Sequence, residues 1–168
     1  MSIKRISFRI YGDPEGKARP RVTFSGGRAH AFTPSKTRRY EDRVCMCAKK
    51  ALDFYDVTQA TDQPCRVEIV ARFEYPKKYL NFTPEGAEIK SFRPGTKAWQ
   101  ELQDLKYGRK LPAKPDADNI AKAVLDALNG VVFTDDAHVF SLNVTKRWRD
   151  PETEKFPGVD VAIEWEEQ

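Results

Sequence analysis

The chain has 168 residues, a length that favours one domain with a single core over two independent domains. Hydrophobic residues make up 40% and charged residues 32%, as in a soluble globular protein, and no apolar run approaches the roughly 20 residues of a membrane helix. The net charge of +4 is unevenly spread, because residues 1–50 contain thirteen Lys/Arg and four Asp/Glu, whereas residues 150–168 contain seven acids and one lysine.

The charge distribution, the N-terminus and the cysteines give expectations about partners and location. A basic first third suits a polyanion such as nucleic acid, although a basic surface can also serve solubility alone. The N-terminal residues MSIKRISFRI lack the long apolar run of a secretory signal, so we expect a cytoplasmic location and no membrane partner. Three cysteines disfavour a disulfide framework, and Cys45-x-Cys47 with only Cys65 lacks the paired spacing of a zinc finger.

The first third of the chain predicts a strand followed by an irregular segment. Residues 3–11 alternate, with Ile6, Phe8 and Ile10 on one side, which is the period-two pattern of a half-buried strand. Residues 12–36, the basic arm, are interrupted by glycines and prolines, and we expect only a short extended piece near residues 21–24. The cations of the basic arm are expected to bind the phosphates of DNA, and they are Lys17, Arg19, Arg21 and Arg28.

The rest of the chain predicts one amphipathic helix over residues 37–52, three more strands and a long insertion. Period-two alternation predicts the strands over residues 65–75, 139–148 and 159–165. Residues 76–113, the insertion, hold eight Lys/Arg and little apolar periodicity apart from a short helical pattern near its C-terminal end. So long a connection in a compact domain indicates a substrate-contacting flap or a mobile segment.

The stretch KPDADNIAKAVLDALNG, which precedes residue 131, carries the most informative acids. Its second residue, a proline, favours an extended backbone, and Asp118 or Asn119 is expected to cap the helix that follows. Asp116 and Asp118 would then lie on the chain leading into the helix and point the same way. The helix has a wide apolar face and a narrow polar one, which places Lys122 one turn beyond Asp118.

The next segment, VVFTDDAHV, brings two further acids. Asn129-Gly130 ends the helix, and a short apolar run then leads to Asp135 and Asp136. Gathered carboxylates suit a hard divalent cation such as Mg²⁺, and they repel one another unless a metal or a lysine compensates. The structural alternative is that these acids serve only as a helix cap, a surface ion pair and a turn, since D-x-D and DD are common in loops.

These stretches resemble a known family. KPDADNIAKAVLDALNGVVFTDDAHV is similar to the signature of RusA-type resolvases, in which a D-x-D-N-x-x-K helix is followed by an aromatic-x-D-D segment. GKARPR, at residues 16–21, and TPSKTRRYED, at residues 33–42, are similar to the arm and first helix of phage-borne members. The insertion is longer than in the most compact members, so the resemblance assigns it no role.

By this resemblance, Asp116, Asp118 and Asp136 are the metal-binding catalytic aspartates and Lys122 is the essential lysine. The cofactor is Mg²⁺, for which Mn²⁺ can substitute, and the number of ions, one or two, stays open. Asp135 is interpreted as a supporting residue. The histidine two residues beyond Asp136 is interpreted as structural rather than as a ligand.

The resemblance also implies a mixed α/β (α+β) fold, with one RusA-like domain in which two helices pack on a small mixed sheet of about four strands. The implied function is a magnesium-dependent, homodimeric endodeoxyribonuclease that resolves Holliday junctions by paired nicks in DNA recombination and repair. A two-fold dimer presents two identical sites to the two equivalent strands of a four-way junction.

Two other functions stay open at this stage. One is a nuclease that acts on forks or flaps, and the other is a non-catalytic protein that binds branched or single-stranded DNA. Most aromatic residues follow the core pattern of the strands, which disfavours the non-catalytic protein, because single-strand binding needs exposed aromatic rings.

Overall fold

The computed structural model describes residues 2–167, without the side chains of residues 21, 23–25 and 30–32. It confirms the four predicted strands and both predicted helices of the body, and it adds regular elements in the basic arm and the insertion. The strands are β1 (Ser2–Tyr11), β2 (Arg21–Ser25), β3 (Arg28–Phe32), β4 (Cys65–Phe73), β5 (Leu80–Thr83), β6 (Gly86–Ile89), β7 (Val139–Trp148) and β8 (Gly158–Glu167). The helices are α1 (Ser35–Phe54), α2 (Lys97–Lys106), α3 (Ala117–Leu128) and the 3-10 turns η1 (Lys77–Tyr79) and η2 (Asp136–His138).

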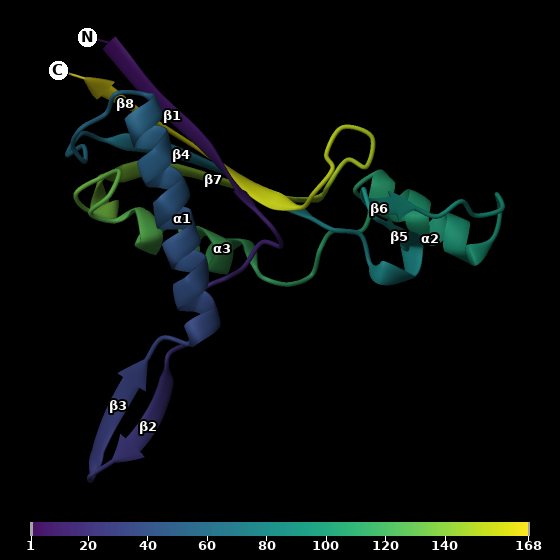
Figure 1. The fold of residues 1–168 in the computed structure, drawn as a ribbon, viewed down its shortest axis with the longest axis horizontal. Helices are drawn as coiled ribbons and strands as arrows, with labels where there is room; N and C mark the ends of the chain where they lie inside the picture. Colours follow the sequence, from purple (N-terminus) through teal and green to yellow (C-terminus); the bar gives the residue numbers. More distant parts are fainter. Residues whose placement is uncertain (1, 168) are drawn as a thin grey trace.

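The main sheet is mixed and has four strands in the order β1-β8-β4-β7 (Figure 1). β8 pairs antiparallel with both β1 and β4, whereas β4 and β7 are parallel. The register puts Ile6, Ile163 and Val67 side by side on one face, as the alternation of apolar residues predicted. The expected fold class, a small mixed sheet packed by helices, is therefore confirmed.

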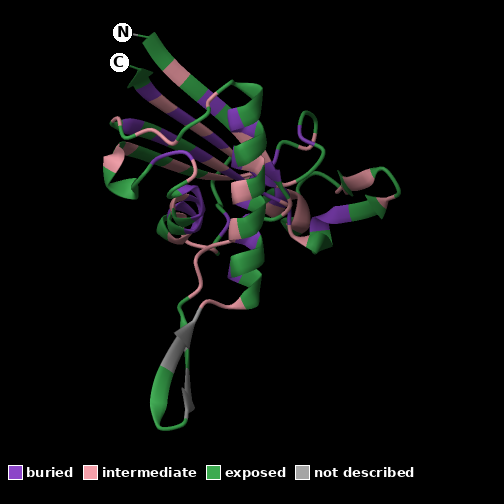
Figure 2. Ribbon diagram, turned by 60° about the vertical axis from the view of Figure 1, so that its left-hand side comes forward, coloured by how far each residue is buried: buried purple, intermediate pink, exposed green. Residues whose placement is uncertain are grey.

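Helices α1 and α3 pack on the apolar face of this sheet. They contact each other, α1 contacts β1, and α3 contacts β7. Figure 2 shows buried and exposed residues alternating along the strands, and the shared core takes Tyr40 and Val44 from α1 and Ile120 and Val124 from α3. Within residues 2–167, no helix combines the length and the apolar character needed to span a membrane.

The basic arm contains a β-hairpin that the sequence did not predict beyond its first strand. β2 and β3 pair antiparallel and project away from the sheet (Figure 1). The tip is Gly26-Gly27, where both residues have positive φ angles, 59° and 73°, a conformation that glycine adopts without steric cost. The expectation that this segment is mostly irregular is therefore wrong, because two adjacent glycines let the chain reverse and pair.

The insertion folds into a small lobe with a core of its own. η1, the β5–β6 hairpin and α2 enclose a second apolar cluster, whose buried members are Tyr75, Tyr79, Leu80, Leu102 and Leu105. Trp148, at the end of β7, packs against this cluster and stacks on Tyr75. The helical pattern near residues 97–105 is confirmed as α2, and the connection as a whole is an ordered lobe rather than an open loop.

A cluster of arginines around Glu154, the Glu154 cluster, joins the lobe to the sheet. The Glu154 carboxylate is only 9% exposed, and it accepts hydrogen bonds from Arg72, at 2.7 Å, from Arg147, and from the backbone N–H of Asp150, at 2.7 Å. Arg149 is fully buried and donates to the carbonyl of Glu154 and, at 2.6 Å, to that of Ala87 in β6. The β7–β8 connection, the sheet and the lobe are thereby tied together.

Candidate active site

Helix α3 begins directly after the first predicted metal ligand. Asp116 occupies the N-cap position with extended backbone, and its carbonyl accepts the first helical hydrogen bond, from Ile120 N, at 3.1 Å. The predicted caps, Asp118 and Asn119, are wrong by two or three positions, because the helix starts closer to the proline than expected. Asp118 consequently lies in the first turn, where the helix dipole favours a negative charge.

Each of the two acids at this helix start has a lysine as its partner. Lys114 Nζ lies 2.9 Å from Asp116 Oδ2 and 3.2 Å from Oδ1, and this hydrogen bond holds the pKa of Asp116 below its ordinary value. Lys122 Nζ lies 3.6 Å from Asp118 Oδ2, which confirms the predicted one-turn spacing. All four side chains are well exposed, so these ion pairs can be exchanged for other partners at little cost.

The second pair of acids follows a firmly anchored turn. Val132 and Phe133 are fully buried, and Thr61 brackets them, since Thr61 N donates to the Val132 carbonyl and the Thr61 carbonyl accepts from Thr134 N. This anchoring fixes the turn from which η2 starts. η2 also contacts α3, which brings the second pair of acids to the same helix as the first.

The two members of the acidic pair have different surroundings. Asp135 caps η2, because its Oδ1 accepts from Ala137 N at 2.8 Å, and its carbonyl accepts from His138 N. Asp136 is exposed, and among the side chains that the structure describes none forms a hydrogen bond or ion pair with its carboxylate. Asp135 is thus used as the cap of η2, and both its supporting role in the site and the assignment of Asp136 to metal stay predictions.

His138 is engaged in the same turn. Its Nδ1 lies 3.1 Å from the carbonyl oxygen of Asp135 and 3.3 Å from Oγ1 of Thr134. One ring nitrogen is therefore used locally, which agrees with the structural interpretation of this histidine.

The donor set at α3 and η2 has the chemistry of a magnesium site, since three carboxylates supply the hard oxygen ligands that this ion prefers. In the described residues, however, no three Asp, Glu, His or Cys side chains are gathered closely enough to surround one ion. Asp116 and Asp118 instead hold lysines, the nearest cations. The common metal site of Asp116, Asp118 and Asp136 accordingly stays a prediction.

A cleft of about 670 Å³ opens beside Asp116, between the basic arm, the start of α1 and the start of α3. The structure brings two predicted DNA-binding residues, Lys17 and Arg19, and a predicted metal ligand to one cavity, whose other cations are Lys36 and Lys114. Lys36 and Lys114 were missed by the sequence analysis. Lys114 could have been found there, because it stands inside the motif itself.

The basic arm lies directly against α3. Lys17 N donates to the carbonyl of Asn119 at 2.8 Å, and a Cβ added at Gly16 would come within 2.8 Å of Pro115 Cβ and 3.0 Å of Asn119 Cβ. A side chain at position 16 would therefore push the arm away from the helix start. The glycine of the GKARPR stretch is explained by this close approach.

Lys17 differs from the other predicted DNA-binding residues. Its ammonium lies 2.5 Å from Glu41 Oε1 of α1 and 2.7 Å from Asp126 Oδ2 of α3. Burial opposes its charge, but the hydrogen bonds to Asp126 and Glu41 outweigh burial and raise its pKa above the ordinary lysine value. Lys17 is thus positioned as a bridge between the two helices, a role that sequence spacing could not indicate.

The remaining predicted DNA contacts lie along the arm. Arg19 is exposed beside the cleft, and Arg28 is exposed at the tip of the hairpin. The side chain of Arg21 lies outside the described residues. The positions of these side chains do not test contact with DNA, so their phosphate-binding roles stay predictions.

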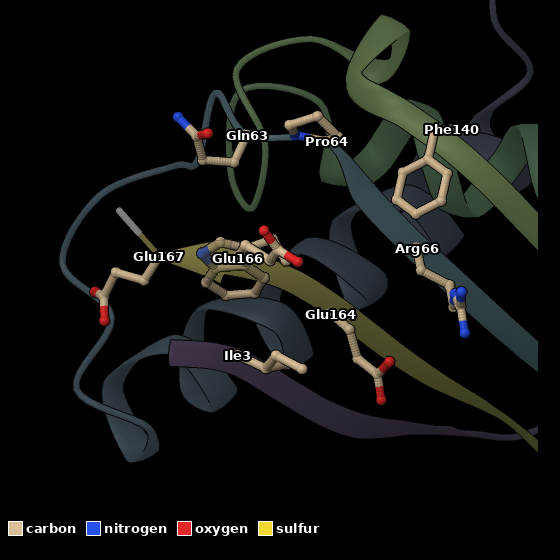
Figure 3. A pocket seen from close by; sticks show the side chains of 9 residues that line it. Ile3, Gln63, Pro64, Arg66, Phe140, Glu164, Glu166 and Glu167 are labelled. Atoms are coloured by element: carbon tan, nitrogen blue, oxygen red, sulfur yellow. The ribbon is translucent and has the colours of Figure 1, made fainter. Parts of the chain in front are cut away.

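A second groove, of about 590 Å³, lies where β1, β4 and β8 meet the start of β7 (Figure 3). Exposed Ile3 and Phe140 line it together with Arg66, Glu164 and other residues of the strand ends. None of the predicted site residues belongs to this groove.

Comparisons with known proteins found one matching family model and a similar protein. The sequence model of a family described as "Endodeoxyribonuclease RusA" matches residues 11–164, which include the arm, the lobe, α3 and η2. The chain is also similar to a protein of Bacillus subtilis (strain 168) described as "Uncharacterized protein YqaN", with 29% identity over 160 residues, covering 94% of each chain.

Proposed function

Because the chain belongs to the RusA endodeoxyribonuclease family, we propose that it is a magnesium-dependent nuclease that resolves four-way DNA junctions by paired nicks. The observation that carries the proposal is the meeting of exposed carboxylates with a cationic cleft at the start of α3. The carboxylates suit a divalent cation, and the cleft suits the backbone of the strand to be cut.

Asp116, Asp118 and Asp136 would hold the magnesium. Once bound there, the ion would stabilise the negative charge that develops on the phosphate and lower the pKa of the attacking water. Binding would require Lys114 to leave Asp116, and its long exposed side chain allows that movement. Lys114 would then be available to the phosphate of the substrate strand.

The other cations of the site would orient that strand. Lys122, one turn beyond Asp118, would place a fixed positive charge near the scissile phosphate or orient the attacking water. Arg19 and Lys36 would hold neighbouring phosphates in the cleft, because backbone contacts fix register without reading sequence.

Two nicks in one junction require two sites, and we expect a homodimer. β7 is an edge strand of the sheet, with Phe140 65% exposed and Leu142 44% exposed, and Phe140 extends into the groove of Figure 3 together with Ile3. Exposed apolar side chains on an unpaired edge are typical of a surface covered by another chain. Phe140→Lys should convert the dimer to a monomer in light scattering, and an unchanged mass would move the interface elsewhere.

The decisive experiment compares synthetic four-way junctions, forks, flaps and linear duplexes with and without Mg²⁺. We expect cleavage that requires Mg²⁺ or Mn²⁺, prefers the four-way junction, and leaves nicks at symmetric positions in opposite strands. Preferred cutting of forks or flaps would assign the nuclease to those substrates. Tight binding of branched DNA with no cutting in any metal would favour the non-catalytic protein.

A further inference from the structure

The segment that leads from the lobe to α3, residues 106–114, has a fixed backbone. Gly108 N donates to the Leu105 carbonyl and Lys110 N to the Asp104 carbonyl, at 3.1 and 3.0 Å. At the middle of the segment, Trp148 Nε1 donates to the Lys110 carbonyl at 2.6 Å. We call residues 106–114 the connecting segment, and it ends two residues before Asp116.

The end of the connecting segment is also held from the sheet. Lys146, on β7, donates to the carbonyls of Ala113 and Pro115, at 3.2 and 2.6 Å. Side chains on the segment therefore keep a set position relative to the start of α3.

The side chains of the connecting segment combine exposed apolar groups with cations. Tyr107 is 73% exposed and Leu111 is 56% exposed, although a folded core lies beside them in the lobe. Four cations share the segment, Lys106, Arg109, Lys110 and Lys114. The guanidinium of Arg109 lies 5.6 Å from the centre of the Tyr107 ring and also pairs with Asp104 at 3.1 Å.

An exposed aromatic ring among cations is the pattern of a surface that binds unpaired nucleotides. The ring stacks on the face of a base, and the cations hold the phosphates on either side. Bases inside a linear duplex have their faces covered by neighbouring base pairs, so a stacking side chain gains nothing there. At a branch point, bases at the crossover can leave the stack and present a face.

We propose that the connecting segment binds unpaired nucleotides at the branch point of the DNA, with Tyr107 stacking on a base and Leu111 packing beside it. Lys106, Arg109 and Lys110 hold the phosphates of the same strand. This inference rests on the proposed function and adds the surface by which the nuclease distinguishes a branch from a duplex. The strand held there continues toward Asp116, where it is cut.

The test uses the full-length protein and a four-way junction that carries 2-aminopurine at the crossover. Binding is measured by fluorescence anisotropy without divalent metal, on the junction and on a linear duplex of the same length. We expect Tyr107→Ala to weaken junction binding about fivefold or more, to leave duplex binding unchanged, and to abolish the change in 2-aminopurine emission. Tyr107→Trp should restore both, because tryptophan also stacks.

Phe54→Ala is the matched control. Phe54 is an equally exposed aromatic residue at the far end of α1, and its replacement should leave all three measurements at the wild-type values. Circular dichroism of each variant checks folding.

The outcomes separate the two proposals. If the wild type cuts junctions with Mg²⁺ while Tyr107→Ala keeps the full junction preference and emission change, the connecting segment is not the branch-binding surface and the proposed function stands. If Tyr107→Ala weakens duplex and junction binding equally, the segment is a general phosphate contact and the inference is overturned. A wild-type protein that neither binds nor cuts junctions overturns both.

Discussion

The carboxylates in two groups of charged residues of this molecule have opposite surroundings. In the Glu154 cluster, a nearly buried carboxylate is surrounded by guanidinium groups and a backbone N–H. At the start of α3, Asp116 and Asp118 are exposed and hold flexible lysines, and Asp136 has no described partner. The first arrangement is complete within the protein, whereas the second leaves oxygen ligands available to something outside it.

Burial separates the structural acids of this chain from the functional ones. Burial makes Glu154 depend on its arginines, because a buried charge without partners is strongly destabilising. Exposure lets the acids of α3 exchange partners at little cost. Substitutions in the two groups should therefore have different effects, one on chemistry and the other on folding.

The largest effect is expected for Asp116→Asn, which keeps the shape of the side chain and removes a charge. Cleavage of junctions in Mg²⁺ should fall at least about 100-fold, equivalent to a barrier increase of about 2.7 kcal/mol or more, because a metal-binding carboxylate is lost. Junction binding without metal should persist or tighten, since one negative charge near the phosphate is gone. Cleavage rate, affinity and melting temperature should be measured on one preparation.

Asp53→Asn, on the exposed end of α1, is the control and should leave cleavage unchanged. Loss of folding together with cutting in Asp116→Asn would make Asp116 a structural residue and remove the contrast with the Glu154 cluster. Retained cutting would remove Asp116 from the metal site.

A smaller effect, on stability rather than chemistry, is expected for Glu154→Gln. The variant should lose about 2 kcal/mol in urea unfolding at pH 7, because Arg72 and Arg147 lose their counter-charge while the glutamine keeps part of the hydrogen bonding. The loss of stability is no larger because the Arg147 side chain is 40% exposed, so that solvent screens its attraction to Glu154. The Mg²⁺ concentration for half-maximal cleavage should not change, and a shift in it would connect this cluster to the metal site.

The stability of the protein should depend on pH through the Glu154 cluster. Burial of Glu154 opposes its charge, but hydrogen bonds from Arg147, the Asp150 backbone and Arg72 outweigh burial and lower its pKa from 4.5 to about 2. Its contribution is therefore complete above about pH 4.5 and is lost as the pH falls toward 2. The stability difference between wild type and Glu154→Gln should shrink over this range, and a constant difference would mean that the charge contributes nothing.

Sequence patterns were sufficient for the main sheet and the body helices, because alternation and helical spacing directly report which face is buried. They also placed Lys122 one turn from Asp118. They failed where the outcome depends on distant partners: Lys17 meets Asp126 only after folding, and the core of the lobe needs Trp148 from β7. The hairpin was missed although Val22 and Phe24 alternate with polar residues just before Gly26-Gly27, because the glycines and prolines of the arm were weighted as signs of irregular structure.

The smallest effect is expected for Arg19→Ala, in the cleft beside Asp116. Loss of one phosphate contact should make the slope of log K against log salt shallower by about 1, with uniform weakening across DNA sequences. Lys49→Ala, an exposed cation of α1, should leave the slope unchanged. An unchanged slope for Arg19→Ala would remove Arg19 from the DNA-binding surface.

The position of β8 has a consequence for how the chain folds during synthesis. β8 lies between β1 and β4 although it follows all other strands along the chain. A ribosome therefore releases β1, β4 and β7 before the strand that joins β1 to the others exists, and the nascent chain carries unpaired apolar strand edges until then. β8 ends in Glu164, Glu166 and Glu167, and such charges beside apolar positions oppose wrong pairing of the late strand. Chaperones that cover strand edges should accordingly bind this protein most while β8 is still inside the ribosome.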